Sequence, residues 1–224
     1  MRIVSLLPSA TEIVCALGAE AELVGISHEC DFPAAVRDRT VLTAPRTHLG
    51  GASREIDEAV RYAIRDALSI YIVDENKLAE LAPDVIVTQD LCDVCAVSLD
   101  DVRNAVARLA HRDAVNVVSL RPTRLADIFG DIERIASAIG RGGEGKVVRA
   151  ELRGRMNEMA ERAAGLSWRP RVATVECIEP LMLGGTWMPE LIRLAGDCRS
   201  AQRPEDPPRR WRLRNWPRWD RKLS

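Results

Sequence analysis

The chain has 224 residues, of which 46% are hydrophobic and 29% are charged, a composition typical of a globular protein. A formal net charge of −1 gives no electrostatic reason to expect a nucleic acid or a membrane surface as a partner. The longest apolar runs are too short to span a bilayer, and no secretory signal precedes the first strand. As written, the sequence therefore predicts a cytoplasmic protein, whereas a mis-assigned start would make it periplasmic or cell-surface.

Short apolar strands alternate with helices along the first 122 residues. Strands are predicted at 2–7, 23–27, 41–43, 84–88 and 114–120, and helices at 9–17, 53–68, 74–81 and 98–110. Ser9, with Glu12 three residues later, predicts a capping box for the first helix. This rhythm predicts a parallel sheet with helices on both faces, in which ligands bind at the carboxyl ends of the strands. The loops 8–11, 28–33 and 89–97 follow such ends, so we expect them to share one edge.

The next segment predicts a long helix between two lobes. Apolar side chains recur there at spacings of three and four residues, which is typical of a helix. They are Leu125, Ile128, Phe129, Ile132, Ile135 and Ile139. Thr123 follows Pro122 and is expected to cap the first turn. We interpret 1–122 as an N-terminal α/β lobe and 123–140 as the interlobe helix.

The remaining chain predicts the start of a second lobe and then a tail. Residues 141–196 predict a helix at 144–164, a strand at 171–177, an exit loop at 178–187 and the first turns of a helix at 189–195. The tail, 197–224, holds nine basic residues, four acidic residues and three of the five tryptophans. It is either a basic segment for a nucleic acid or membrane, or a segment outside the fold, such as a frame-shifted read. The second interpretation is favoured because a single strand cannot bury its own faces.

Four segments resemble the vitamin B12 and iron-siderophore substrate-binding proteins of ABC transporters. They are residues 2–12 (RIVSLLPSATE), 27–33 (SHECDFP), 88–98 (TQDLCDVCAVS) and 185–191 (GTWMPEL). The second and third segments are similar to the branch called cobalamin-binding proteins. The resemblance extends over about residues 2–196.

The resemblance implies a periplasmic-binding-protein-like α/β fold, with two Rossmann-like lobes joined by a single long helix and, in this chain, an incomplete second lobe. It implies a corrinoid such as cobalamin, or a related metal chelate, as the ligand in the interlobe cleft, and an ABC-transporter permease as a partner. We expect a monomer without a required cofactor. The family consists of binding proteins, and no catalytic motif in a fitting context occurs in the sequence, so an enzyme is not expected.

The segments that match the family also supply the candidate ligand-binding residues. These are Pro8, Ser9, His28, Glu29, Gln89, Asp90, Cys177 and Trp187. Large flat ligands are usually held by apolar and aromatic walls, and aromatic side chains flank the corrin ring in the familiar B12-binding members. Here the matching loops carry Glu29, Gln89 and Cys177, so Trp187 is the one large ring expected at the cleft.

The cysteines support a different hypothesis. Without an export signal, the six cysteines are not expected to form a disulfide framework. Cys92 and Cys95 form a CxxC pair, and Cys30 and His28 are expected at the same sheet edge, so four ligands that zinc accepts can converge. The alternative function is therefore a cytoplasmic metal-binding or redox protein. Thiols that only pack the cleft wall, and a truncated product without a function, are the remaining alternatives.

Overall fold

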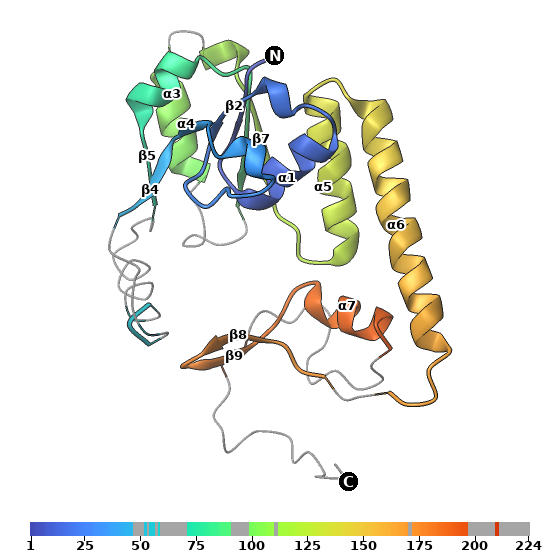
Figure 1. The fold of residues 1–224 in the computed structure, drawn as a ribbon. Helices are drawn as coiled ribbons and strands as arrows, with labels where there is room; N and C mark the ends of the chain where they lie inside the picture. Colours follow the sequence, from blue (N-terminus) through green and yellow to red (C-terminus); the bar gives the residue numbers. More distant parts are fainter. Residues whose placement is uncertain are drawn as a thin grey trace.

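The computed structural model describes residues 1–46, 52, 54–56, 58, 71–90, 99–109, 112–169, 172–196 and 209–210. These residues form an α/β fold in which a first lobe, built on a parallel sheet, is followed by a smaller C-terminal unit (Figure 1). Within this part of the chain, no helix combines the length and the apolar character that crossing a membrane requires.

The first lobe is built on five parallel strands. They are β1 (Ile3–Ser5), β2 (Leu23–Ile26), β3 (Thr40–Val41), β6 (Val85–Gln89) and β7 (Asn116–Leu120). Their order is β3-β2-β1-β6-β7, and every neighbouring pair is parallel. The chain moves from β1 outward to β3 and later returns to the other side of β1. The strand order therefore reverses beside β1, which is the usual ligand position in such sheets.

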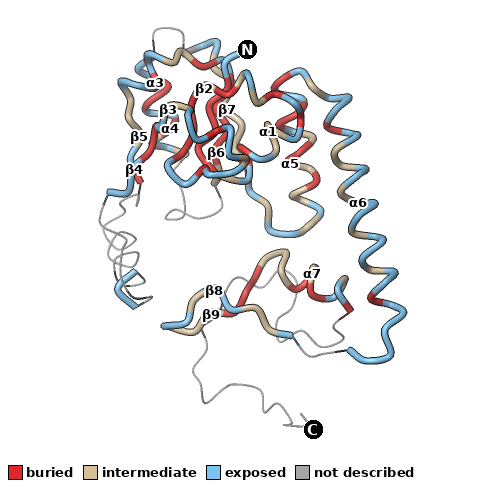
Figure 2. The backbone as a smooth tube through the Cα atoms, in the orientation of Figure 1, coloured by how far each residue is buried: buried red, intermediate tan, exposed pale blue. Residues whose placement is uncertain are grey.

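Helices cover both faces of this sheet because successive residues of a strand point to opposite faces. Ile3 packs in a cluster with residues of α1 (Pro8–Ala16) and α5 (Leu125–Ala138). Val4 packs in the opposite cluster, with residues of α3 (Glu75–Leu81) and α4 (Leu99–Ala107). All of β1 is buried, as expected for a central parallel strand. Figure 2 shows buried segments gathered about β2 and β6 in the middle of the first lobe.

The strand expected at 41–43 is divided between two sheets. Its first part belongs to β3, which pairs with β2, whereas β4 (Thr43–Pro45) pairs in antiparallel fashion with β5 (Tyr71–Val73). The β4–β5 ribbon brings together segments that are far apart in the sequence. Most of the helix expected at 53–68 lies outside the described residues.

The C-terminal unit consists of β8 (Val175–Ile178), β9 (Leu181–Leu183), α7 (Met188–Leu194) and β10 (Arg209–Arg210). Its strands are antiparallel in the order β10-β9-β8. The exit loop expected at 178–187 is therefore wrong in part, because residues 181–183 fold back on β8 and satisfy its backbone groups. β10 belongs to the tail, and the rest of the tail lies outside the described residues.

Two consecutive helices lead from the first lobe to the C-terminal unit. α5 packs on the core of the first lobe through Ile135 and Ala136. The longer α6 (Gly142–Ala164) then runs along α5 and continues to the C-terminal unit (Figure 1). The division of the chain at residues 122 and 140 stays a prediction.

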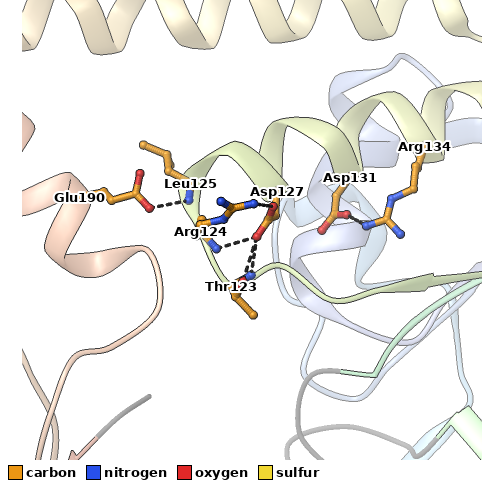
Figure 3. Close-up of polar contacts among 7 residues, drawn as sticks. All are labelled: Thr123, Arg124, Leu125, Asp127, Asp131, Arg134 and Glu190. Carbon is orange, nitrogen blue, oxygen red and sulfur yellow. Dashed lines mark hydrogen bonds and ion pairs between the residues drawn. The ribbon is translucent and has the colours of Figure 1, made fainter. Parts of the chain in front are cut away.

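A carboxylate fixes the start of α5. The N-cap residue is Arg124, and Asp127 Oδ2 accepts hydrogen bonds from the backbone N–H groups of Thr123 (3.0 Å) and Arg124 (2.8 Å) (Figure 3). The Thr123 hydroxyl also donates to Asp127 Oδ2, at 3.0 Å. The expected Thr123 cap is therefore wrong, because its hydroxyl binds the carboxylate instead of a backbone N–H. These hydrogen bonds favour the ionised carboxylate and lower the pKa of Asp127 to about 2.

Candidate functional site

The carboxyl ends of β1, β2 and β6 meet at one edge of the five-stranded sheet. β2 and β6 both pair with β1 in parallel, with Ser5 opposite Ile26 and Val87. The segments that follow these strands therefore leave the same edge, as the sequence predicts. These segments contain six of the candidate residues, Pro8, Ser9, His28, Glu29, Gln89 and Asp90.

Pro8 and Ser9 form the first turn of α1. The helix begins at Pro8, and its N-cap residue is Leu7, without a side-chain cap hydrogen bond. The capping box predicted for Ser9 is wrong because Pro8, whose φ is fixed near the helical value, occupies the first helical position. Ser9 is exposed at the sheet edge and Pro8 is half-buried. Contact of either residue with a ligand stays a prediction.

A buried polar cluster joins the segments after β1 and β2. Thr11 Oγ1 lies 2.9 Å from Ser5 Oγ and 3.1 Å from Cys30 Sγ, and Ser5 Oγ donates to the carbonyl oxygen of Leu7 at 3.0 Å. Ser5 and Thr11 are fully buried and Cys30 is nearly so. Burial raises the pKa of the Cys30 thiol, which favours its protonated form. The cluster therefore supports the loop that carries His28 and Glu29.

His28 is held by a threonine from β4. Thr43 Oγ1 accepts the backbone N–H of His28 at 3.0 Å and lies 2.7 Å from His28 Nδ1. The same oxygen lies 3.0 Å from Ser27 Oγ. Ser27 and Thr43 are buried, whereas His28 is exposed. The imidazole is thus fixed on one side by buried hydroxyl groups, and its other side is accessible.

Glu29 is held by a tyrosine from β5. The Tyr71 hydroxyl donates to Glu29 Oε1 at 2.9 Å, and the Tyr71 ring lies 5.0 Å from the His28 ring at an interplanar angle of 56°. Tyr71 is buried, and Glu29 is exposed. Thr43 and Tyr71 are absent from the sequence-based site. The sequence does contain a signal for Tyr71, because a tyrosine in a short apolar run is expected to be buried and its hydroxyl then needs a hydrogen-bond partner.

Gln89 and Asp90 end β6 at the same edge. Both are half-buried, and the backbone N–H of Asp90 donates to the carbonyl oxygen of Leu120 at 2.8 Å. Cys92 and Cys95 lie outside the described residues. Among the residues that are described, no group of three His, Cys, Asp or Glu side chains is arranged to hold a metal ion. A metal site that includes Cys30, Cys92 and Cys95 stays a prediction.

The C-terminal unit carries the other two candidate residues. Cys177 lies on β8 and is half-buried, and Trp187 precedes α7 and is also half-buried. Two apolar side chains that the sequence-based site lacks are more exposed: Ile178 on β8 is 78% exposed and Phe32, after β2, is 63% exposed. Exposed apolar residues on both parts of the chain are chemically suited to a large apolar ligand.

Among the described residues, two polar contacts connect the first lobe to the C-terminal unit. Glu190 Oε1, on α7, accepts the backbone N–H of Leu125 at the start of α5, at 3.2 Å (Figure 3). Arg54 forms an ion pair with Glu179, which lies between β8 and β9. Since α5 begins soon after β7 ends, the first contact lies toward the carboxyl edge of the sheet. The C-terminal unit is therefore attached on the side where the candidate residues of the first lobe gather.

A separate hollow lies among α5, α6 and α7. It has a volume of about 290 Å³ and is lined by Phe129, Arg153, Met156, Asn157 and Leu194. The Arg153 guanidinium carbon lies 5.1 Å from the centre of the Phe129 ring. None of the candidate ligand-binding residues lines this hollow.

Comparison with protein-family models and with curated protein sequences gives no match. Comparison with solved structures gives clear similarities. The periplasmic heme-binding protein RhuT from Roseiflexus sp. RS-1 has a TM-score of 0.63 at 17% identity, over 88% of this chain and 64% of that one. The periplasmic vitamin B12 binding protein BtuF of Vibrio cholerae has a TM-score of 0.61 at 18% identity, over 95% of this chain and 71% of that one.

A possible iron-binding, periplasmic solute-binding protein from Staphylococcus epidermidis gives a TM-score of 0.63 at 15% identity, over 88% of this chain and 65% of that one. The chain thus spans roughly two thirds of the length of these proteins. The shared property at these identities is the fold. The chain has the α/β fold of periplasmic substrate-binding proteins for heme, vitamin B12 and iron, with the second lobe incomplete.

Proposed function

We propose that this chain is the substrate-binding protein of an ABC-type importer and that it takes a corrinoid, such as cobalamin, or a related metal chelate in the interlobe cleft. The observation that carries the proposal is the pair His28 and Glu29. Both are exposed at the carboxyl edge of the parallel sheet, and each is anchored by a buried side chain. A rigid pair of polar groups at this edge suits ligand recognition, because ligands of such sheets bind where the strand order reverses.

The chemistry of the surrounding residues supports a large, partly apolar ligand. Phe32 and Ile178 supply exposed apolar surface from the first lobe and the C-terminal unit, and Trp187 supplies an aromatic ring. Pro8, Ser9, Gln89, Asp90 and Cys177 complete the proposed site. Binding brings the two parts together without a chemical step, so the chain acts as a carrier and not as an enzyme.

Location and partner follow from the same proposal. RhuT and BtuF are periplasmic proteins by name, and this favours the periplasmic or cell-surface alternative over the cytoplasmic prediction. The partner is an ABC-transporter permease that recognises the ligand-loaded form. We propose a monomer as the working state.

Equilibrium dialysis tests the function directly. The purified chain is dialysed against dicyanocobinamide, cyanocobalamin and hemin in turn, and retention is read from the visible absorbance of each chelate. We expect one bound corrinoid per chain. Retention of none of the three chelates by a chain with a cooperative unfolding transition contradicts the proposed function.

A further inference from the structure

His28 and Glu29 each have one side-chain polar atom bound by a buried residue and a second one that no residue in the described part of the chain binds. Tyr71 occupies Glu29 Oε1, and Thr43 occupies His28 Nδ1. No described residue binds Glu29 Oε2 or His28 Nε2. The two free atoms belong to adjacent residues on one exposed turn, so a ligand group at the sheet edge can reach both.

The hydroxyl network assigns a role to the free imidazole nitrogen. The Thr43 hydroxyl has one hydrogen, which it donates to Ser27 Oγ at 3.0 Å, and one lone pair accepts the backbone N–H of His28 at 3.0 Å. The remaining lone pair faces His28 Nδ1 at 2.7 Å, so Nδ1 carries the hydrogen and donates it. In the neutral imidazole, His28 Nε2 is then an acceptor. Glu29 Oε2 is an acceptor as well, so the pair accepts hydrogen bonds at both positions.

The net charge of residues 28–37 also favours a ligand group that donates hydrogen bonds over one that is negatively charged. Residues 28–37 carry two carboxylates, Glu29 and Asp31, against one guanidinium, Arg37. The Arg37 Nε–H group donates to the backbone carbonyl of Asp31 at 2.9 Å. The segment is therefore net negative. A ligand carboxylate placed here has no hydrogen to donate and is repelled, whereas a primary amide is uncharged and donates two.

We infer that His28 and Glu29 select metal chelates whose periphery carries primary amides over chelates whose periphery carries carboxylates. This inference rests on the proposed function and narrows its ligand. Corrinoids carry acetamide and propionamide side chains around the ring, whereas heme carries two propionates. His28 and Glu29 thus favour a corrinoid over heme. They do so by hydrogen bonds to the side chains at the periphery of the ring, without a bond to the metal.

A matched pair of ligands isolates this effect. Dicyanocobyrinic acid heptaamide and dicyanocobyrinic acid share ring, cobalt and axial cyanides, and they differ only in amides against carboxylates. Because cyanide fills both axial positions of the cobalt, a difference in affinity between the two ligands reports contacts with their peripheral amides or carboxylates. We expect the heptaamide to bind at least about tenfold more tightly, since the acid offers no hydrogen to Glu29 or His28 and its carboxylates are repelled by Glu29.

Glu29→Gln tests the residue that carries the charge. The variant keeps an acceptor oxygen and removes the repulsion, so the ratio of the two dissociation constants should fall toward one. Tyr71→Phe should lower the ratio in part, because Glu29 loses the donor that positions it. Glu151→Gln, an exposed change of the same kind on α6, should leave the ratio unchanged.

The possible outcomes separate the two proposals. Equal affinity for both corrinoids, or a ratio that Glu29→Gln leaves unchanged, overturns the inference while the proposed function stands. Retention of hemin without either corrinoid does the same. Binding of none of these chelates overturns the proposed function and the inference together.

Discussion

At the scale of single residues, the carboxylate of Asp127 fixes the start of α5. Its side chain accepts four hydrogen bonds from Thr123 and Arg124, three at Oδ2 and one at Oδ1, which comes from the Arg124 guanidinium at 3.3 Å. Their common effect is a pKa of about 2 for this carboxyl, below its ordinary value of 3.8. The ionised side chain is therefore a stabilising element whose strength depends on pH.

Replacement of Asp127 by alanine should lower the free energy of unfolding by about 1 kcal/mol near neutral pH, as for the loss of other N-terminal caps. Since the folded pKa is the lower one, this stabilisation is complete above pH 3.8 and is lost as the pH falls through about 2. Urea unfolding near neutral pH and at about pH 3 measures the difference. Asp127→Asn, which keeps an acceptor oxygen, should lose less. An equal loss for Asp127→Ala at both pH values contradicts this account.

At the scale of elements, the contact between α5 and α6 depends on a glycine. A Cβ atom added at Gly145 on α6 lies 2.5 Å from the Ala136 Cβ atom on α5, which is closer than two carbon atoms pack. At Gly154, on the same helix, a Cβ atom has no neighbour within 4 Å. The two glycines form a matched pair, one at a packed interface and one in solvent.

Gly145→Ala should destabilise the protein by about 1–3 kcal/mol, because overpacking outweighs the gain in helix propensity. Gly154→Ala should stabilise it by about 0.5–1 kcal/mol, because alanine favours a helix and meets no clash. Thermal unfolding of both variants beside the wild type gives the sign of each change. The same sign for both glycines argues against a tight α5–α6 contact.

The sequence predicts elements that depend on local pattern and misses those that depend on distant partners. The apolar runs at β1, β2, β6 and β7 predict these parallel strands, and the rhythm of strands and helices predicts the shared edge. β9 is missed because its three residues between a proline and two glycines resemble a loop, and only pairing with β8 makes them a strand. Tyr71 is missed at the site because its partner Glu29 is 42 residues away in the sequence.

At the scale of the whole molecule, the attachment of the C-terminal unit depends on two carboxylates of different kind. Glu190 is half-buried and binds the N-terminus of α5, where the helix dipole strengthens the contact. Glu179 pairs with Arg54, and both side chains of that pair are more than half exposed. Exposed ion pairs contribute little and are screened by salt, so Glu190 is the stronger attachment.

Glu190→Ala should therefore speed proteolysis of the segment after α6, while fragments of the first lobe persist. Glu179→Gln should have a smaller effect, visible only at low ionic strength. Limited proteolysis with mass analysis of the fragments, at low and high salt, compares the two variants. If Glu179→Gln releases the C-terminal unit more readily than Glu190→Ala, the order of importance is reversed.

The length and register of helix α6 also fix the distance and the rotation between the first lobe and the C-terminal unit. Only Gly145 and Ala163, near its two ends, are buried among its 23 residues (Figure 2). Gly145 lies against α5, and Ala163 lies against Gly196, just after α7, so the helix is held at two points about 27 Å apart. One inserted residue in the exposed middle rotates the C-terminal unit by about 100°, which separates Glu190 from Leu125. Seven inserted residues restore the rotation to within about 20° but lengthen the span by about 10 Å, so the register of this helix sets which surfaces of the two parts face each other.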